Sequence, residues 1–343
     1  MTDRTGQDAR ADILIVLGSD DRYALPLAVT LYSGLRRIPD SVRVDALIFD
    51  AGITPQNRAR IERVGRLAHA NLDIAWVSPD MDQFAGLRTT HWGSPASYLP
   101  LLIPQIVEGD RQVLYLDSDL LIEGNLNELW QLGAEDHRPV HAVRDYGFPT
   151  VGSALKGDAA IRLGIDGDAP YFNSGVLLID LPAWRSAKIA DRALDFARDH
   201  PDVMRFTDQD ALNAVIQGDW AQLDPRWNVL VGSIDLMAER LGGTDAERAQ
   251  HKESLTKTPN ILHFSGQQKP WKAGYSRLGR GKYLRTVHES GWFDSQTDYW
   301  SWRLKLTMLS PMVKARRQIV KLTWPIVVRI REQRSPAKVS ASQ

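Results

Sequence analysis

Short apolar runs that alternate with helical patterns constrain the fold of this chain more than any other feature of its sequence. In the first third, the strand-like runs are residues 13–17, 42–49, 72–77 and 112–116, and the helical patterns between them are 23–38, 54–68 and 95–107. Thr54 and Pro55 form a typical N-cap and first helical residue. Strands and helices in alternation predict an α/β fold with a mostly parallel sheet covered by helices on both faces.

The second half of the chain is less regular. We expect strands at 140–144, 173–179 and 261–264, helices at 183–197 and 211–217, and a weak helical signal over 232–258. The composition changes near residue 294. We therefore predict three parts: a disordered N-terminus (1–10), a catalytic domain (11–294) and a basic, aromatic C-terminal tail (295–343).

The composition excludes several classes of protein. There are no cysteines, so disulfides and thiolate metal sites are excluded. No apolar run approaches the roughly 18 residues of a transmembrane helix, and residues 1–10 lack the apolar core of a signal peptide. Basic and acidic side chains number 42 each, so the chain as a whole lacks the charge of a nucleic-acid-binding protein. We therefore expect a cytoplasmic protein that does not bind nucleic acid.

Acidic residues lie where two predicted strands end. Asp20 follows the first strand, and Asp117 and Asp119 directly continue the apolar run 113–116. Ligands of open α/β sheets bind at the carboxyl ends of the strands. In an extended segment, residues i and i+2 point the same way, so both carboxylates can reach one divalent cation. This indicates a metal site.

The acidic pattern is weak evidence by itself. The sequence Asp-x-Asp occurs four times, at 80/82, 117/119, 166/168 and 208/210, and each can equally be a solvated turn or a helix cap. Only the pair at 117/119 follows a buried strand. His263 ends the last predicted strand, and an imidazole with two carboxylates suits Mn²⁺ better than Ca²⁺. The alternative for His263 is an ordinary core or surface histidine.

Five segments together resemble the family 8 glycosyltransferases, which include glycogenin and bacterial lipopolysaccharide glucosyl- and galactosyltransferases. They are Gly-Ser-Asp-Asp-Arg-Tyr-Ala at 18–24, Val-Leu-Tyr-Leu-Asp-Ser-Asp at 113–119, Tyr-Phe-Asn-Ser-Gly-Val-Leu-Leu-Ile at 171–179, Asp-Gln-Asp-Ala-Leu-Asn at 208–213 and His-Phe-Ser-Gly-Gln-Gln-Lys-Pro-Trp at 263–271. The resemblance covers residues 11–275 in the right order. It implies a GT-A type nucleotide-diphospho-sugar transferase fold that binds a UDP-sugar through a divalent metal, usually Mn²⁺, with Mg²⁺ as the alternative.

The resemblance also assigns roles to residues of this chain. The implied metal ligands are Asp117, Asp119 and His263. The implied donor-binding residues are Gly18, Ser19 and Asp20 for uracil and ribose, Gly266 and Lys269 for the diphosphate, and Asp145, Asn173, Asp208 and Gln209 for the sugar. Asp208 and Gln209 are the pair from which a nucleophile or cation stabiliser would come. We interpret Asp210 as a structural cap of the following helix.

One position departs from the family. A Tyr-x-Arg segment of family members supplies an arginine to the donor, whereas this chain has Tyr98-Leu99-Pro100. Proline has neither charge nor donor, so either Arg88 or Lys272 replaces the arginine or donor recognition differs.

The resemblance implies a retaining UDP-hexose transferase that acts on a glycan or lipid-linked acceptor, as in lipopolysaccharide or surface polysaccharide synthesis. Retention can arise by double displacement through an enzyme nucleophile or by attack from the leaving-group face. The alternatives are a non-catalytic UDP-sugar-binding protein and a sugar-nucleotide hydrolase or nucleotidyltransferase. The loop at 18–21 lacks the Gly-rich Gly-x-Gly-Thr-Arg pattern of nucleotidyltransferases.

The tail 295–343 holds ten basic and two acidic side chains, a formal charge of +8, with Trp300, Trp302 and Trp324 among aliphatic residues. Over residues 312–324 apolar and basic residues partly segregate, and we expect Pro311 and Pro325 to limit the helix. Basic and aromatic side chains together favour attachment to an anionic membrane, which predicts a peripheral position at its inner face. The alternative is a C-terminal helix that packs on the catalytic domain.

Overall fold

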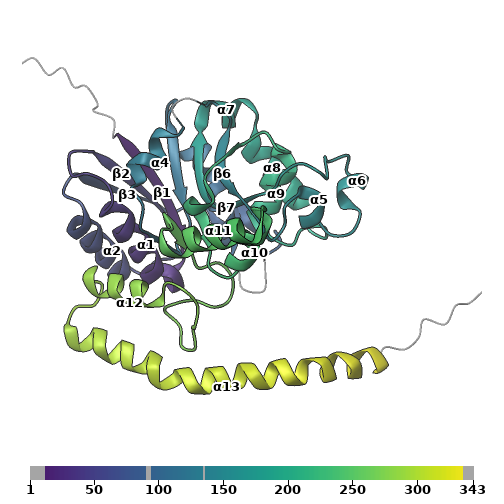
Figure 1. The fold of residues 1–343 in the computed structure, drawn as a ribbon. Coiled ribbons are helices and arrows are strands. Elements are labelled where there is room, and N and C mark those ends of the chain that lie inside the picture. The colour runs from purple at the N-terminus through teal and green to yellow at the C-terminus, as the bar shows by residue number, and fades with distance from the viewer. Residues whose placement is uncertain (1–11, 90–93, 134–135, 335–343) are drawn as a thin grey trace, which may run out of the picture.

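The computed structural model describes residues 12–89, 94–133 and 136–334, and the side chains as far as residue 315. The predicted disordered segment 1–10 lies outside the described residues. The central element is a sheet of seven strands (Figure 1). In spatial order these are β3 (Leu72–Val77), β2 (Val44–Asp50), β1 (Ile13–Ser19), β4 (Gln112–Leu116), β7 (Phe172–Asp180), β6 (Val140–Arg144) and β8 (Ala221–Gln222).

The sheet is mostly parallel, as predicted. β1 pairs in parallel with β2 and β4, β2 with β3, and β6 with β8. β7 runs antiparallel to both β4 and β6. A second sheet of three short strands, which the sequence pattern did not predict as a unit, contains β5 (Leu120–Ile122), β10 (Ile261–His263) and β9 (Val229–Leu230).

Helices cover the main sheet on both sides, which confirms the layered α/β fold. They are η1 (Asp21–Tyr23), α1 (Ala24–Leu35), α2 (Pro55–Ala68), η2 (Met81–Phe84), η3 (Pro95–Leu102), α3 (Ile103–Ile106), α4 (Leu126–Gln131), α5 (Val151–Ala154), α6 (Ala159–Arg162), α7 (Leu181–Ser186), α8 (Ile189–Asp199), α9 (Thr207–Ile216), η4 (Pro225–Asn228), α10 (Ile234–Arg240), α11 (Asp245–Lys257), α12 (Arg280–Glu289) and α13 (Gln296–Arg334).

Strand β1 shows how the two sides of the core arise. Ile13, Ile15 and Leu17 belong to the hydrophobic core that includes α1, α2 and the small sheet. Leu14 and Val16 belong to a second core that includes η3, α8 and α9. Alternate side chains of a strand point to opposite faces, and here both faces are apolar because both are covered.

Several predicted helices need correction at their ends. The pattern at 183–197 is two helices, because Lys188 adopts a left-handed conformation with φ of 50° between α7 and α8. The segment 95–107 is mostly a 3₁₀ helix, η3, with Pro100 inside it. The helix predicted at 211–217 begins earlier, at Thr207, so the acidic segment at 208–210 lies in its first turn.

Helix α13 is one continuous helix of 39 residues. The expectation that Pro311 and Pro325 limit it is wrong, since the helix passes both. A proline removes one intrahelical hydrogen bond but does not by itself end a long helix. In Figure 1 the helix runs along the lower side of the domain and extends past it. Among the described residues, no helix combines the length and the apolar composition that crossing a bilayer requires.

Candidate active site

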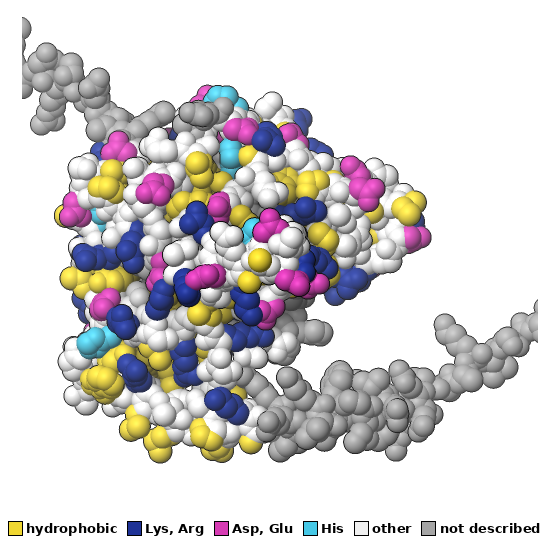
Figure 2. Space-filling view, in the orientation of Figure 1, with side chains coloured by type: hydrophobic (Ala, Val, Ile, Leu, Met, Phe, Trp, Pro, Cys, Tyr) yellow, Lys and Arg dark blue, Asp and Glu magenta, His cyan; other side chains and the backbone are white. Residues whose placement is uncertain are grey.

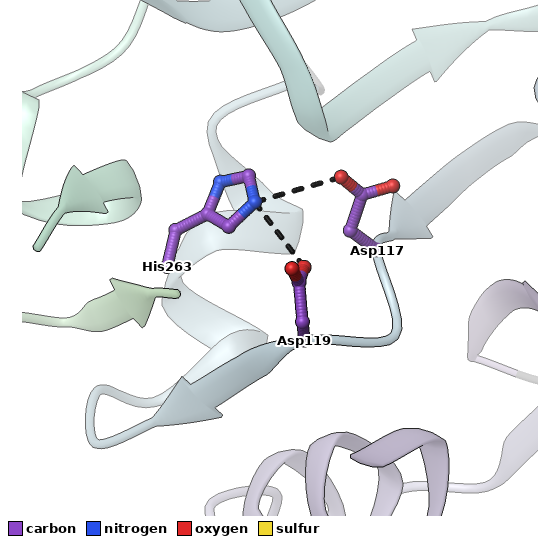
Figure 3. Close-up of side chains that lie close together, drawn as sticks. All are labelled: Asp117, Asp119 and His263. Atoms are coloured by element: carbon purple, nitrogen blue, oxygen red, sulfur yellow. Dashed lines mark ion pairs between the residues drawn. The ribbon is translucent and has the colours of Figure 1, made fainter. Parts of the chain in front are cut away.

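Asp117, Asp119 and His263 meet at the carboxyl edge of the main sheet (Figure 3). Asp117 follows β4, Asp119 precedes β5, and His263 ends β10. His263 Nε2 lies 3.2 Å from Asp119 Oδ1 and 3.6 Å from Asp117 Oδ2. One potential ligand atom from each residue lies within 4.8 Å of the others. This donor set, oxygen-rich with one imidazole, fits a divalent cation such as Mn²⁺.

Pairing within the small sheet brings together residues far apart in the sequence. β10 runs antiparallel to β5, with His263 opposite Leu120. The backbone N–H of Phe264 donates to the carbonyl of Asp119 at 3.0 Å. The chain crosses from the large sheet to the small one at 117–119. The two carboxylates and the imidazole therefore come together where the chain passes from one sheet to the other.

Gly175 on β7 is what allows this close approach. Its carbonyl accepts a hydrogen bond from the backbone N–H of Asp117 at 2.9 Å. A Cβ at this position would lie 2.8 Å from Asp117 Oδ2 and 2.9 Å from His263 Nδ1, closer than real Cβ contacts allow. Gly175 lies inside a family motif, but no role for it could be predicted from the motif alone. The structure assigns it one, which is to leave room for the carboxylate and the ring.

The site concentrates negative charge on a buried carboxylate, Asp119, and a partly buried one, Asp117. Burial, followed by the charge of Asp119, raises the pKa of Asp117 to about 7. For Asp119, burial opposes ionisation, but Lys269 and then His263 outweigh it and hold its pKa well below the usual range. Two carboxylates that lie so near each other cannot both ionise unless cations lie beside them. The cluster is therefore arranged to be stabilised by positive charge.

In this structure Lys269 supplies part of that charge. Its ammonium donates to an Asp119 oxygen and, at 2.8 Å, to the carbonyl of Phe264. It lies 5.6 Å from the ring centres of both Tyr23 and Trp271, a distance at which cation–π attraction acts. The predicted diphosphate contact of Lys269 stays a prediction. Gly266, in the same loop, has a φ of 80°, which favours glycine.

A cavity of about 160 Å³ opens beside the acidic pair. Its lining includes Gly18, Ser19 and Asp20 at the end of β1 together with Asp117 and Asp119. The predicted uridine-binding loop and the two carboxylates of the predicted metal site thus share one cavity. Ser19 Oγ is buried without a hydrogen-bond partner among the described residues. Buried hydroxyls normally find a partner, so an unpaired one beside a cavity points to a ligand.

The four residues predicted to line the donor sugar are also buried. They are Asp145, Asn173, Asp208 and Gln209. Gln209 Nε2 donates to Asp145 Oδ2 at 3.1 Å, and Asn173 Nδ2 donates to Gln209 Oε1 at 2.8 Å. Asp208 accepts from the Thr207 hydroxyl at 2.9 Å, and burial raises its pKa. Asp208 also contributes to the raised pKa of Asp117, which indicates that the sugar-side and metal-side groups are near one another.

Asp210 has a different environment from its two neighbours. Its carboxylate accepts from the Tyr171 hydroxyl at 2.5 Å and from the backbone N–H groups of Arg205 and Phe206 at 2.5 and 2.7 Å. It therefore ties down the segment that leads into α9. This supports the structural interpretation of Asp210.

Pro100, which replaces the family arginine, is buried within η3. The two proposed substitutes are both exposed: the Arg88 guanidinium donates to the carbonyl of Pro201 at 3.1 Å, and Lys272 lies on the loop after Lys269. Arg22 is the arginine that lines the cavity, and it forms an ion pair with Asp20 at 2.6 Å. Sequence reasoning missed Arg22 even though it belongs to the 18–24 motif.

Two further residues beside the ligands were missed. The Tyr115 hydroxyl donates to Asp117 Oδ1 at 2.8 Å, which fits its position two residues earlier on the same strand face. Asn228 Oδ1 accepts a hydrogen bond from His263 Nδ1 at 2.9 Å. Asn228 is the last residue of η4, directly before β9, and this position carries no sequence signal.

The fold and this cluster define a class: a glycosyltransferase of the GT-A type. The model of glycosyl transferase family 8 matches residues 14–274, well over half of the chain, and the protein belongs to this family.

Known proteins resemble the chain over most of its length. "General stress protein A" of Bacillus subtilis is 28% identical over 81% of this chain and 94% of its own length. The lipopolysaccharide 1,2-glucosyltransferase of Escherichia coli is 28% identical over 69% of this chain and 68% of its own length. The crystal structure of the galactosyltransferase LgtC, in complex with donor and acceptor sugar analogs, superposes with a TM-score of 0.66 at 26% identity. It covers 80% of this chain and 95% of that one.

Proposed function

We propose that this protein is a retaining, metal-dependent hexosyltransferase. It transfers galactose or glucose from a UDP-sugar to a glycan or lipid-linked acceptor, as in lipopolysaccharide or surface polysaccharide synthesis. The observation that carries the proposal is one cavity lined by both the strand β1 loop, Gly18 to Asp20, and the acidic pair, Asp117 and Asp119. Membership of family 8 and the relatives named as glucosyl- and galactosyltransferases support it.

The metal ligands in this proposal are Asp117, Asp119 and His263, and the ion is Mn²⁺ or Mg²⁺. Their donor atoms already converge, and the buried negative charge needs a cation. A bound divalent ion would act as a Lewis acid toward a diphosphate leaving group. Lys269 lies beside Asp119 and adds a second positive charge on the same side of the site.

The groups on the sugar side would act on the reacting carbon. When the bond between sugar and phosphate breaks, positive charge develops on the anomeric carbon. Asp208 and the carbonyl oxygen of Gln209 are buried and polar, so they can stabilise that charge more strongly than water would. Asp145 and Asn173 hold the Gln209 amide by hydrogen bonds.

Retention of the anomeric configuration can arise by two routes, and the chemistry of the residues on the sugar side favours one of them. An amide such as that of Gln209 is a poor nucleophile, so we propose attack from the leaving-group face, with the departing phosphate taking the acceptor's proton. The competing route is a double displacement, for which Asp208 is the available carboxylate. A glycosyl adduct on Asp208, trapped and identified by mass spectrometry, would establish the competing route.

The test of the proposed function is release of UDP from UDP-galactose and UDP-glucose with Mn²⁺, with and without saccharide acceptors. We expect turnover that depends on both the metal and an acceptor. Equal release without any acceptor would instead identify a sugar-nucleotide hydrolase. UDP binding without any release would identify a non-catalytic binding protein.

We also propose that α13 attaches the enzyme to an anionic membrane surface at the cytoplasmic face. One side of the helix packs on the domain through Tyr299, Leu306 and the half-buried Trp302. The opposite side carries a stripe of exposed apolar residues spaced four apart: Trp300, Leu304, Met308 and Met312. In Figure 2 apolar side chains gather along the lower edge of the molecule, where this helix lies.

The positive charge of the tail also favours attachment of α13 to an anionic membrane surface. The exposed Lys305 and Lys314 lie on the described part of α13, and the whole tail has a charge of +8. Basic residues near an anionic surface contribute about 1 kcal/mol each. The helix would lie flat on the membrane with its apolar stripe at the headgroups. The division of the chain at residue 294 is part of this proposal, although the packed side of α13 joins the tail to the domain.

A further inference from the structure

A line of five buried side chains connects the predicted metal ligand His263 to the sugar side of the site. From one end to the other they are His263, Asn228, Asn173, Gln209 and Asp145. The consecutive hydrogen bonds are His263 Nδ1 to Asn228 Oδ1 at 2.9 Å, Asn228 Nδ2 to Asn173 Oδ1 at 2.8 Å, Asn173 Nδ2 to Gln209 Oε1 at 2.8 Å and Gln209 Nε2 to Asp145 Oδ2 at 3.1 Å. We call this line the amide relay.

Backbone groups fix the direction of the amide relay. The N–H of Gly175 donates to Asn173 Oδ1 at 3.1 Å, and the N–H of Ser174 donates to Gln209 Oε1 at 3.3 Å. A backbone N–H can only donate, so neither amide can turn over without leaving a buried N–H unpaired. At the other end, Asp145 Oδ2 accepts from Gln209 Nε2, and a turned amide would place its oxygen against this carboxylate oxygen.

The direction of the relay decides which nitrogen of His263 carries hydrogen. Asn173 Oδ1 accepts a hydrogen bond from Asn228 Nδ2, so the oxygen of the Asn228 amide must face His263. That oxygen accepts, and Nδ1 must therefore hold the hydrogen. Nε2 is then the atom that faces the two carboxylates. A histidine that donates its second N–H is oriented as a metal ligand and is more basic.

We propose that Asn228 is a positioning residue that sets His263 for metal binding and, through Asn173, holds Gln209 in place on the sugar side. This inference rests on the proposed function, since it assumes a metal at His263 and a sugar at Gln209. Asn228 is 1% exposed, and both ends of its amide are bonded within the relay. Asn228 is not among the residues that line the cavity, and its amide bonds His263 and Asn173, so it acts through these neighbours.

Two substitutions separate the two ends of the Asn228 amide. Asn228→Leu keeps the approximate size and removes both hydrogen bonds. Asn228→Asp keeps an oxygen that accepts from His263 Nδ1 but places a second oxygen against Asn173 Oδ1. The aspartate therefore preserves the metal side and breaks the sugar side of the relay.

Asn213 provides a matched control. It is also an asparagine that is 1% exposed, but its amide bonds only main-chain atoms of Phe172 and Gln209. Asn213→Leu removes a comparable set of buried hydrogen bonds without touching His263. A loss of stability common to both positions is thereby separated from an effect on the metal.

The experiment measures Mn²⁺ affinity in the full chain by the electron paramagnetic resonance signal of the free ion, and turnover of UDP-sugar separately. We expect Asn228→Leu to weaken Mn²⁺ binding by tenfold or more, within the range of about 10–100-fold typical for partners of metal ligands. Asn228→Asp should keep Mn²⁺ affinity within about threefold while turnover at saturating Mn²⁺ falls about tenfold. Asn213→Leu should leave Mn²⁺ affinity within about twofold at temperatures where it stays folded.

Three results would overturn the inference. Unchanged Mn²⁺ affinity in Asn228→Leu would remove the metal side, and unchanged turnover in Asn228→Asp would remove the sugar side. Equal losses of affinity in both Asn228 variants would mean that the contact with His263 is not the cause. If the wild-type protein itself binds no Mn²⁺, the proposed metal site fails and the inference fails with it. Wild-type binding together with an unaffected Asn228→Leu variant would refute the inference alone.

Discussion

The candidate active site and the outer face of α13 reverse the usual relation between polarity and burial, in opposite directions. At the site, charged groups such as Asp119, Asp208 and Lys269 are buried. On α13, Met308 and Met312 are 66% and 70% exposed. Ordinary proteins bury apolar groups and expose charged ones. Each region is therefore costly for the isolated chain, and in our proposals a divalent cation offsets the cost at the site and a membrane surface offsets it at α13.

The two regions differ in how tightly the fold holds them. The buried polar groups are linked by hydrogen bonds to the backbone and to one another, so their geometry is fixed before a ligand arrives. The exposed face of α13 has no such network in the described residues and is defined only by helical spacing. A fixed polar site suits chemistry, whereas a repeated apolar face suits a partner without fixed shape, such as a lipid surface. The predictions below test this contrast, beginning with the largest expected effect.

The acidic pair should give the largest loss. Asp117→Asn and Asp119→Asn should each lower UDP-sugar turnover at least about 100-fold, since each removes a charge that the cation needs. Their stabilities should differ. Asp117→Asn removes a carboxylate whose charged form is disfavoured, so the melting temperature should hold or rise. Asp119→Asn leaves Lys269 buried without its partner and should cost about 3 kcal/mol of unfolding free energy. Full activity in either variant would place the metal elsewhere.

Gly175→Ala tests whether the geometry of the site is fixed. The added methyl would lie 2.8 Å from Asp117 Oδ2, so the carboxylate or the His263 ring must move. We expect Mn²⁺ affinity to fall about 10–100-fold, comparable to losing a partner of a metal ligand. Gly152→Ala is the control, because it crowds only backbone of Gly167 away from the site. Isothermal titration with Mn²⁺ reads out both, and wild-type affinity in Gly175→Ala would contradict the close packing described above.

Metal binding should depend on pH because a proton competes for Asp117. Burial and Asp119 raise the pKa of this carboxyl to about 7, so at neutral pH about half of the metal-free molecules hold a proton there. The cation needs the carboxylate, so binding releases that proton. Mn²⁺ affinity should therefore fall by up to about tenfold for each pH unit below about 7 and level off above it. Titrations in buffers of different ionisation enthalpy measure the released proton, and a flat affinity across that range would refute the competition.

Gln209→Ala should separate the sugar side from the nucleotide side. We expect turnover to fall about tenfold, roughly 1.4 kcal/mol, while UDP affinity changes little. The side-chain amide of Gln209 is held by Asp145, Asn173 and the backbone N–H of Ser174, none of which belongs to the predicted uridine-binding loop. Turnover and UDP binding are measured on the same protein preparation. A tenfold loss of UDP affinity would assign Gln209 to the nucleotide instead.

The sequence predicted the strands well and the helix ends poorly. The seven predicted strands all exist. Apolar runs such as 13–17 are buried on both faces, which is the environment of a central strand in a layered α/β fold. The break at Lys188 was missed, since a single left-handed residue leaves no trace in hydrophobic spacing. The passage of α13 through Pro311 was missed because one lost hydrogen bond is small beside the packing of a long helix.

For the site, the sequence supplied the residues but not the connections between them. The motifs contain Asp117, His263 and Gln209, and the structure brings all of them to one edge of the sheet. Asn228 lies outside every motif, and only the antiparallel and parallel pairing of β10 brings it beside His263. Spacing along a chain cannot reveal a contact of this kind, which depends on three separate segments.

The outer face of α13 should give the smallest effect, because it acts on location and not on chemistry. Leu304→Ser together with Met308→Ser removes two exposed apolar side chains without touching the packed side of the helix. We expect binding to vesicles containing phosphatidylglycerol to weaken about fivefold, since only part of each side chain enters the interface and each buried methylene contributes about 0.8 kcal/mol. The matched control is Ile161→Ser, which removes a side chain 85% exposed on α6. Co-sedimentation at low and high salt measures both, and turnover with a soluble acceptor should be unchanged. Equal vesicle binding by the double variant and the wild type would mean that this face of α13 does not meet the membrane.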